Sequence, residues 1–144
     1  MKKMLVVLVL LSLVSTVCVQ AQTPAGSTMS VHFPPNSANL RAVSTELAIA
    51  NLQTFTQVAR QLADNPQARV LIDGHANAIL GTVAEERNTL RPLSQRRAEA
   101  AANFLVENFR IDRHRLIIAG AGGGYPTSST DGSQNRRVSF TIIR

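Results

Sequence analysis

The spacing of apolar side chains predicts two amphipathic helices after residue 28. In the first, apolar residues recur at three- and four-residue intervals, and they are Leu47, Leu52, Phe55, Val58, Ala59 and Leu62. Ser44 or Thr45 can cap its start, and Asn65-Pro66 ends it. The second helix is predicted from Ser94 as its N-cap, with an inner stripe of Ala98, Ala101, Ala102, Leu105 and Phe109.

Four short segments have the composition and alternation of β-strands. They are Met29 to Phe33, Arg69 to Asp73, Arg115 to Ala119 and Arg137 to Ile143. In the last segment we expect Val138, Phe140 and Ile142 to face one side of the strand, and Ser139, Thr141 and Ile143 to face the other. The order βαβαββ predicts an α/β, two-layer sandwich with a mixed sheet and both helices on one face.

The first 21 residues have the pattern of a secretory signal peptide. Lys2 and Lys3 precede an apolar run from Met4 to Val14, and Val19-Gln-Ala21 offers a cleavage site. The run is short for a membrane span, which needs about 20 apolar residues, although a retained anchor is the alternative. We expect residues 22–29 to form a short linker and residues 30–144 a single domain.

Cys18 introduces a second possibility for the N-terminus. A cysteine just after the apolar run can mark the cleavage and lipidation site of a lipoprotein. Such sites favour a small residue immediately before the cysteine, and here that residue is Val17. Membrane attachment is therefore expected only if Cys18 is lipidated; cleavage after Ala21 would leave a mature chain without cysteine.

Charge and aromatic content argue against a nucleic-acid partner. Residues 22–144 contain thirteen arginines, no lysine and nine acidic residues, a net charge of +4. The arginines are scattered, and five Phe and one Tyr provide no regular stacking surface for bases. Export from the cytoplasm also makes nucleic acid an unsuitable partner. We therefore predict none.

The sequence also lacks the usual signatures of a catalytic or metal site. Histidines occur at positions 32, 75 and 114, without His-Glu-x-x-His or cysteine partners. Ser94 has no acid–base pair nearby in the sequence and is interpreted as a helix cap. No metal or cofactor is predicted.

Two further patterns are better explained by structure than by chemistry. The segment Gly120 to Tyr125 is glycine-rich, but Pro126 and a Ser/Thr-rich stretch follow it in place of the helix that a phosphate-binding loop requires. Glu85-Glu86 lies in a polar stretch that we interpret as a solvated face. We therefore predict a protein without enzymatic activity.

Four motifs, in a fixed order, resemble the OmpA-like domain family. They are Val31-His-Phe33 leading to Asn36-Ser-Ala-Asn-Leu40, Asp73-Gly-His75, Leu93-Ser-Gln-Arg-Arg-Ala98 and Asn135-Arg-Arg-Val138. This family comprises envelope modules found in outer-membrane porins, peptidoglycan-associated lipoproteins and flagellar stator proteins. The resemblance implies a location in the periplasm, at the outer membrane or at the cell wall, and non-covalent binding of peptidoglycan.

The resemblance also implies a chemistry. Such domains hold the zwitterionic end of the diamino acid in the peptidoglycan stem peptide, with an arginine on its carboxylate and an acid on its ammonium. The arginine corresponds to Arg97, and guanidinium suits a carboxylate because it donates parallel hydrogen bonds. The acid corresponds to Asn77, and the family's other contacts to Asn36 and to Arg136 or Arg137. A solvated helix-face arginine is the alternative interpretation of Arg97.

The chain departs from the family at three of these positions. Asn77 replaces the acid, Pro34 replaces an acidic residue, and Leu90 replaces an asparagine. The segment between Asn77 and Arg97 is also longer than usual, with the extra residues in the polar stretch 82–91. Two hypotheses follow: a domain that still binds peptidoglycan stem peptides, or a degenerate fold that serves as a structural or protein-interaction module in the envelope.

Overall fold

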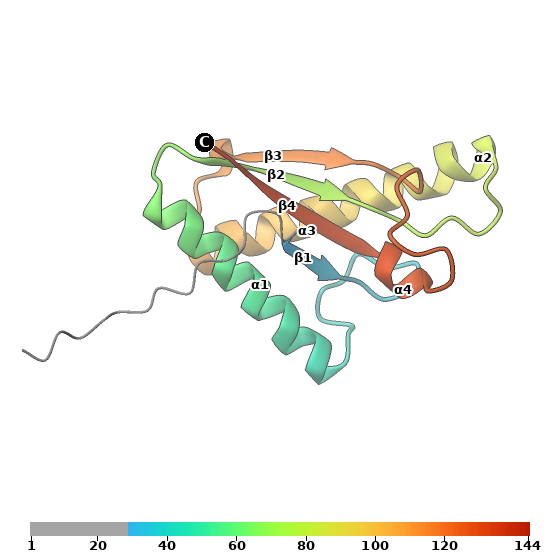
Figure 1. The fold of residues 1–144 in the computed structure, drawn as a ribbon, viewed down its shortest axis with the longest axis horizontal. Coiled ribbons are helices and arrows are strands. Elements are labelled where there is room, and N and C mark those ends of the chain that lie inside the picture. The colour runs from blue at the N-terminus through green and yellow to red at the C-terminus, as the bar shows by residue number, and fades with distance from the viewer. Residues whose placement is uncertain (1–28) are drawn as a thin grey trace, which may run out of the picture.

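The computed structural model describes residues 29–144, which form a four-stranded sheet with two long helices on one face (Figure 1). The strands are β1 (Met29–His32), β2 (Arg69–Gly74), β3 (Leu116–Gly120) and β4 (Arg137–Ile143). They lie in the order β1-β4-β2-β3, with β2 parallel to β3 and the other neighbours antiparallel. The predicted α/β sandwich with a mixed sheet is confirmed.

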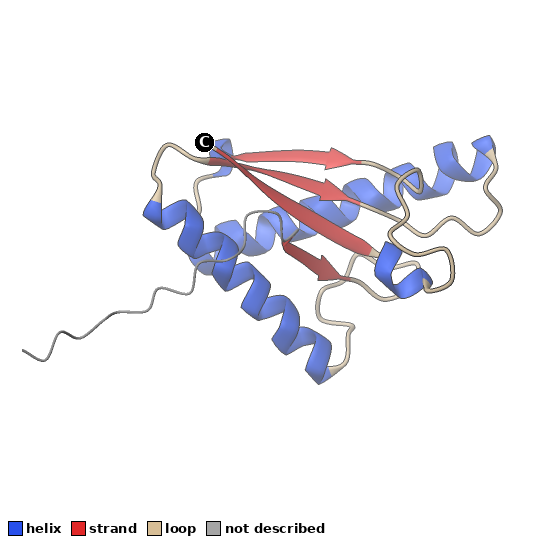
Figure 2. Ribbon diagram, viewed as in Figure 1, coloured by secondary structure: helices blue, strands red, loops and turns tan. Residues whose placement is uncertain are grey.

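Two long helices and several short ones connect the strands (Figure 2). The long helices are α1 (Thr45–Asp64) and α3 (Arg91–Phe109). The short ones are α2 (Val83–Glu85), a π-helical turn (Glu86–Leu90), a 3-10 turn (Arg113–Arg115) and α4 (Gly132–Asn135). The predicted signal peptide, Cys18 and the linker lie outside the described residues, except for Met29, which begins β1.

Helix α1 begins at the predicted cap but buries a slightly different face. The Leu47 amide donates to Ser44 Oγ at 3.3 Å. The prediction that Leu52 belongs to the apolar, core-facing stripe is wrong, because half of its surface is exposed. The preceding residue, Asn51, points inward instead, and its side chain exchanges two 2.9 Å hydrogen bonds with the backbone N–H and C=O of His32. These bonds attach the edge strand β1 to the helix.

The second long helix begins twelve residues before the predicted cap. Thr82 Oγ1 accepts a hydrogen bond from the Glu85 amide at 3.1 Å, and helical structure then continues through α2 and the π-helical turn into α3. The π-helical turn ends at Leu90, two residues before Pro92, which has no amide hydrogen and would crowd the carbonyl of Asn88 in a regular α-helix. The polar stretch is therefore helical.

The prediction that Ser94 is an N-cap is wrong. Ser94 is fully buried inside α3, where its hydroxyl donates to the Arg91 carbonyl and accepts from the Gly122 amide, both at 2.9 Å. A buried hydroxyl needs such partners because leaving it unpaired costs about 1–3 kcal/mol. Ser94 thus joins α3 to the loop after β3.

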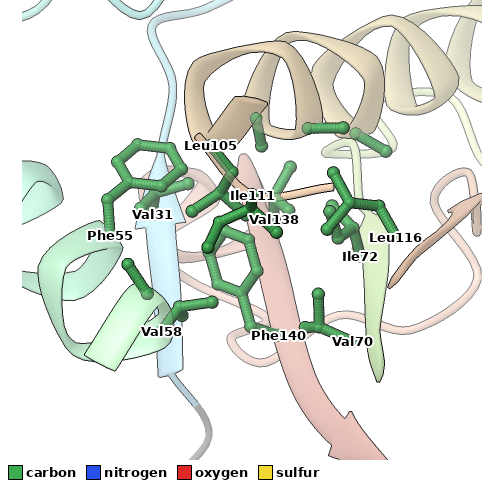
Figure 3. Close-up of a cluster of buried hydrophobic side chains, with 14 of the residues drawn as sticks. Val31, Phe55, Val58, Val70, Ile72, Leu105, Ile111, Leu116, Val138 and Phe140 are labelled. Carbon is green, nitrogen blue, oxygen red and sulfur yellow. The ribbon is translucent and has the colours of Figure 1, made fainter. Parts of the chain in front are cut away.

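The core lies between the helices and one face of the sheet (Figure 3). Alternate strand residues supply it, as period-two alternation predicts: Val31, Val70, Ile72, Leu116, Val138 and Phe140. Val138, Phe140 and Ile142, predicted to share one face of β4, do so: the first two are buried and Ile142 packs against the cluster. Helix α3 contributes mainly alanines, and these small side chains let it approach β2 and β3 closely.

Two paired glycines make this close approach possible. Gly74 of β2 lies opposite Gly120 of β3. A Cβ atom on Gly74 would lie 2.0 Å from the Ser94 carbonyl oxygen, and one on Gly120 would lie 2.8 Å from the Gln95 amide nitrogen. Both neighbours are backbone atoms of α3, so a side chain at either position must move the helix.

We expect Gly74→Ala to destabilise the domain by about 1–3 kcal/mol, the usual cost of overpacking. Gly124→Ala is the matched control, because no atom lies within 4 Å of a Cβ placed there. Urea unfolding followed by circular dichroism measures both. Equal midpoints for the two variants would contradict the close contact between β2 and α3.

Candidate functional site

Four of the five predicted site residues line one pocket at an end of the sheet. The pocket has a volume of about 110 Å³. Asn36 follows β1, Asn77 follows β2, Arg97 belongs to α3, and Arg136 immediately precedes β4. The other lining residues are Pro35, Ile79, Glu85, Thr89, Leu90 and Leu93. The fold thus brings together segments that are up to 100 residues apart.

Arg97 is fully buried and holds three backbone carbonyls. Its Nε donates to the Ser37 carbonyl at 2.9 Å, its Nη1 to that of His75 at 2.9 Å, and its Nη2 to that of Pro34 at 3.0 Å. The interpretation of Arg97 as a solvated helix-face residue is therefore wrong. A guanidinium carries five N–H groups, so two remain, one on each terminal nitrogen.

The charge of Arg97 has no acidic partner among the described residues. No Asp or Glu in residues 29–144 forms an ion pair with it. Burial, followed by the positive charges of Arg136 and Arg96, lowers the pKa of Arg97 to about 10, so it stays protonated at neutral pH. Its guanidinium carbon also lies 5.6 Å from the centre of the Phe33 ring, within range of a cation–π attraction.

Asn77 is held in place by Asn135, the first residue of the Asn-Arg-Arg motif. Asn135 Nδ2 donates to Asn77 Oδ1 at 2.9 Å, and Asn135 Oδ1 accepts from the amides of Thr127 and Ser128. Gly132 also packs closely against Asn77, since a Cβ on Gly132 would lie 2.9 Å from Asn77 Nδ2. Asn135 therefore connects the loop after β2 to the loop before β4.

The two arginines of this motif point to different places. Arg136 is half-buried, lines the pocket, and has a buried Nε without a hydrogen-bond partner. Arg137 lies outside it and donates to the Tyr125 carbonyl at 3.3 Å and to Thr127 Oγ1 at 3.5 Å. Of the two predicted candidates, the structure brings Arg136 to the other site residues.

All three departures from the expected pattern border Arg97 or the pocket: Asn77 and Leu90 line the pocket, and Pro34 contacts Arg97. The Pro34 backbone carbonyl accepts a hydrogen bond from Arg97. This position, where an acidic residue was expected, therefore contacts the guanidinium through a neutral oxygen. Leu90 is buried with Ala76 and Leu93, and it gives the pocket an apolar wall. Asn36, at the pocket's edge, is exposed and has a φ of 51°, a left-handed conformation that asparagine tolerates.

Glu85 lines the pocket and was missed as a site residue. Its Oε1 accepts from the Ile79 amide at 3.0 Å, and its Oε2 accepts from the amides of Leu80 and Gly81 at 2.9 and 2.8 Å. These bonds, chiefly that of Ile79, lower the pKa of Glu85. The sequence Thr82-Val-Ala-Glu85 is a capping-box pattern and could have located both the helix start and this carboxylate.

The neighbouring His75 is buried and uncharged at neutral pH. Burial, followed by the charge of Arg137, lowers its pKa, and Nδ1 has no hydrogen-bond partner. Within residues 29–144, no three His, Cys, Asp or Glu side chains come close enough to hold a metal ion. The helices of this region are too short or too polar to cross a membrane.

We expect Arg97→Ala to destabilise the domain by about 3 kcal/mol or more, because it leaves three backbone carbonyls without their charged donor. Arg96→Ala is the matched control: the same charge is lost from an exposed neighbour, and the change in unfolding free energy should stay within about 0.5 kcal/mol. Chemical denaturation compares the two. Similar stabilities would show that the carbonyl bonds of Arg97 contribute little.

Many solved structures share this fold, and three of them show the extent of the likeness. The peptidoglycan-associated lipoprotein from Burkholderia pseudomallei is 24% identical, with a TM-score of 0.62 over 80% of this chain and 90% of that chain. The OmpA-like domain of FopA1 from Francisella tularensis is 17% identical, with a TM-score of 0.63 over 78% and 70%. A putative MotB-like protein from Desulfovibrio vulgaris is 20% identical, with a TM-score of 0.57 over 79% and 68%.

The sequence comparisons complete the assignment. No curated protein sequence matches this chain. The model of the OmpA family matches residues 32–139, from the end of β1 into β4, and this range includes all of the residues that line the pocket. The chain therefore belongs to the OmpA family.

Proposed function

We propose that this chain is a non-catalytic cell-envelope domain that binds peptidoglycan stem peptides non-covalently. The supporting observation is the pocket itself, in which Asn36, Asn77, Arg97 and Arg136 converge from four segments. These residues correspond to the positions at which the family resemblance implies ligand contacts. The name of the structural neighbour from Burkholderia, a peptidoglycan-associated lipoprotein, is consistent with this assignment.

The charges of the pocket suit a carboxylate. Arg136 presents a half-buried guanidinium to the pocket, and Arg97 adds a second positive charge from a fully buried position. Because guanidinium–carboxylate hydrogen bonds are charge-assisted, they are stronger than neutral ones. We therefore assign the direct contact with the ligand carboxylate to Arg136. Arg97 positions the pocket walls and adds to the positive electrostatic potential inside the pocket.

The size of the pocket limits what can enter it. A volume of about 110 Å³ corresponds to roughly three or four water molecules, and it is well below the range of about 300–1,000 Å³ typical of sites for larger ligands. The pocket can receive the charged end of one amino acid, while the rest of a peptide stays outside. The end of a stem-peptide diamino acid meets this requirement.

The proposal places the protein in the periplasm, at the outer membrane or at the cell wall. The predicted signal peptide supports export, and lipidation at Cys18 would add a membrane attachment. Peptidoglycan is the proposed partner in either case.

Arg136→Gln tests the binding proposal without removing the bonds that Arg97 makes. We expect the variant to be retained on purified sacculi about tenfold or more weakly than wild type, because a charge-assisted contact is lost. Arg60→Gln, on the exposed surface of α1, is the charge-matched control and should be retained like wild type. Retention of all three proteins to the same extent, or of none, would refute the proposal.

Asn77→Asp should strengthen binding of a diaminopimelate-containing peptide roughly five- to thirtyfold, since a charge-assisted bond is about 1–2 kcal/mol stronger than a neutral one. An aspartate keeps an oxygen for the bond from Asn135 Nδ2, so the loop contacts persist. Isothermal titration calorimetry measures the affinity. An unchanged or weaker affinity would mean that residue 77 does not face the ligand ammonium.

A protein-interaction module in the envelope is the second candidate. Large apolar side chains near the pocket are unusually exposed: Ile79, Leu80, Val83 and Tyr125 are each more than 70% accessible. Val83 and Tyr125 also line an adjacent groove of about 500 Å³. In addition, the bonds of Arg97 to backbone carbonyls give that residue a structural role. Failure of wild type to bind sacculi would favour this candidate.

A further inference from the structure

The pocket contains one acidic side chain among its lining residues, and it is not at position 77. Glu85 lines the same pocket as Asn77, Arg97 and Arg136. It is carried there by the helical extension that begins after Thr82, within the polar stretch 82–91. The extension thus brings a carboxylate to a pocket whose expected aspartate has become an amide.

The Glu85 carboxylate is fixed in position. The amides of Ile79, Leu80 and Gly81 donate to it, and Thr82 Oγ1 holds the Glu85 backbone amide. A side chain held in this way loses little additional rotamer freedom when a ligand binds, which favours affinity. The three donors also stabilise the ionised form, so the carboxylate keeps its negative charge near neutral pH.

The carboxylate still has capacity for a cation. An ionised carboxylate offers about four lone-pair sites on its two oxygens. Oε2 accepts two amide hydrogens, whereas Oε1 accepts only that of Ile79. Oε1 therefore retains an acceptor site.

We infer that Glu85 binds the ligand ammonium and replaces the acid that position 77 lacks. This inference rests on the proposed function. In this arrangement Arg136, with Arg97 behind it, attracts the carboxylate of an amino-acid end, and Glu85 attracts its ammonium. The site then selects a ligand that carries both charges, and it discriminates against a diamino acid whose terminal amine has been neutralised.

Two peptides test this selectivity by isothermal titration calorimetry with the mature domain. One contains diaminopimelate with its terminal amine free, and the other is acetylated at that amine. We expect wild type to prefer the free amine by roughly five- to thirtyfold. Glu85→Gln should reduce this preference towards one, and adding Asn77→Asp to Glu85→Gln should restore it.

Thr82→Ala is the structural control, because it removes the cap of the same helical turn without changing charge. It should keep the wild-type preference although it removes the hydrogen bond of the Glu85 amide, a loss that faster hydrogen exchange at that amide reports. An unchanged preference in Glu85→Gln, or equal binding of the two peptides by wild type, would overturn the role of Glu85 but leave the proposed function standing. Absence of binding to either peptide by wild type would overturn the proposed function as well.

Discussion

A buried guanidinium that has no acidic partner within residues 29–144 determines the structure around the pocket. Removing the charge of Arg97 from water is costly, and the chain offsets that cost with three carbonyl oxygens and the face of Phe33. Two of these carbonyls belong to the segment after β1, and the third, that of His75, follows β2. A single side chain of α3 therefore sets the distance between two loops that the sheet alone would leave independent.

The same chemistry recurs at the opposite end of the sheet. Arg115, just before β3, donates to the carbonyls of Ala68, Leu62 and Asn65 at 2.8 Å. These oxygens lie at and beyond the last turn of α1, where helical carbonyls lack partners within the helix. The domain thus uses arginines as multidentate donors to backbone. An arginine in such a sequence need not indicate an anionic ligand. Arg136 makes no such bonds to backbone carbonyls of the described residues, so it is the stronger candidate for contact with a ligand.

The periodic patterns predicted most of the fold. Alternation identified the residues that share one face of β4, and the three- and four-residue spacing identified the inner stripe of α3, because both depend on burial over several residues. Single-residue roles were harder. Ser94 has the composition of a cap, but its burial against Gly122 depends on a contact 28 residues away. Leu52 fits the helical period, yet Asn51 takes the inward place because β1 offers it two backbone partners.

The pocket was predictable only in part, and for the same reason. The resemblance supplied Asn36, Asn77, Arg97 and Arg136, and the structure gathers them. It could not separate Arg136 from Arg137, whose side chains diverge at the start of β4. Nor could it supply Glu85, which lies in the polar stretch 82–91, outside the four motifs that carry the resemblance.

The position of β4 also constrains when the domain can form. This strand is the last of the four in the sequence, yet it lies between β1 and β2 in the sheet. Until residues 137–143 have been synthesised, β1 has no strand to pair with and the apolar face of α1 lacks Phe140, so β1 and α1 cannot complete their native packing. The completion of the sheet therefore depends on a strand far away in the sequence from its partner β1, and non-local pairings of this kind slow folding.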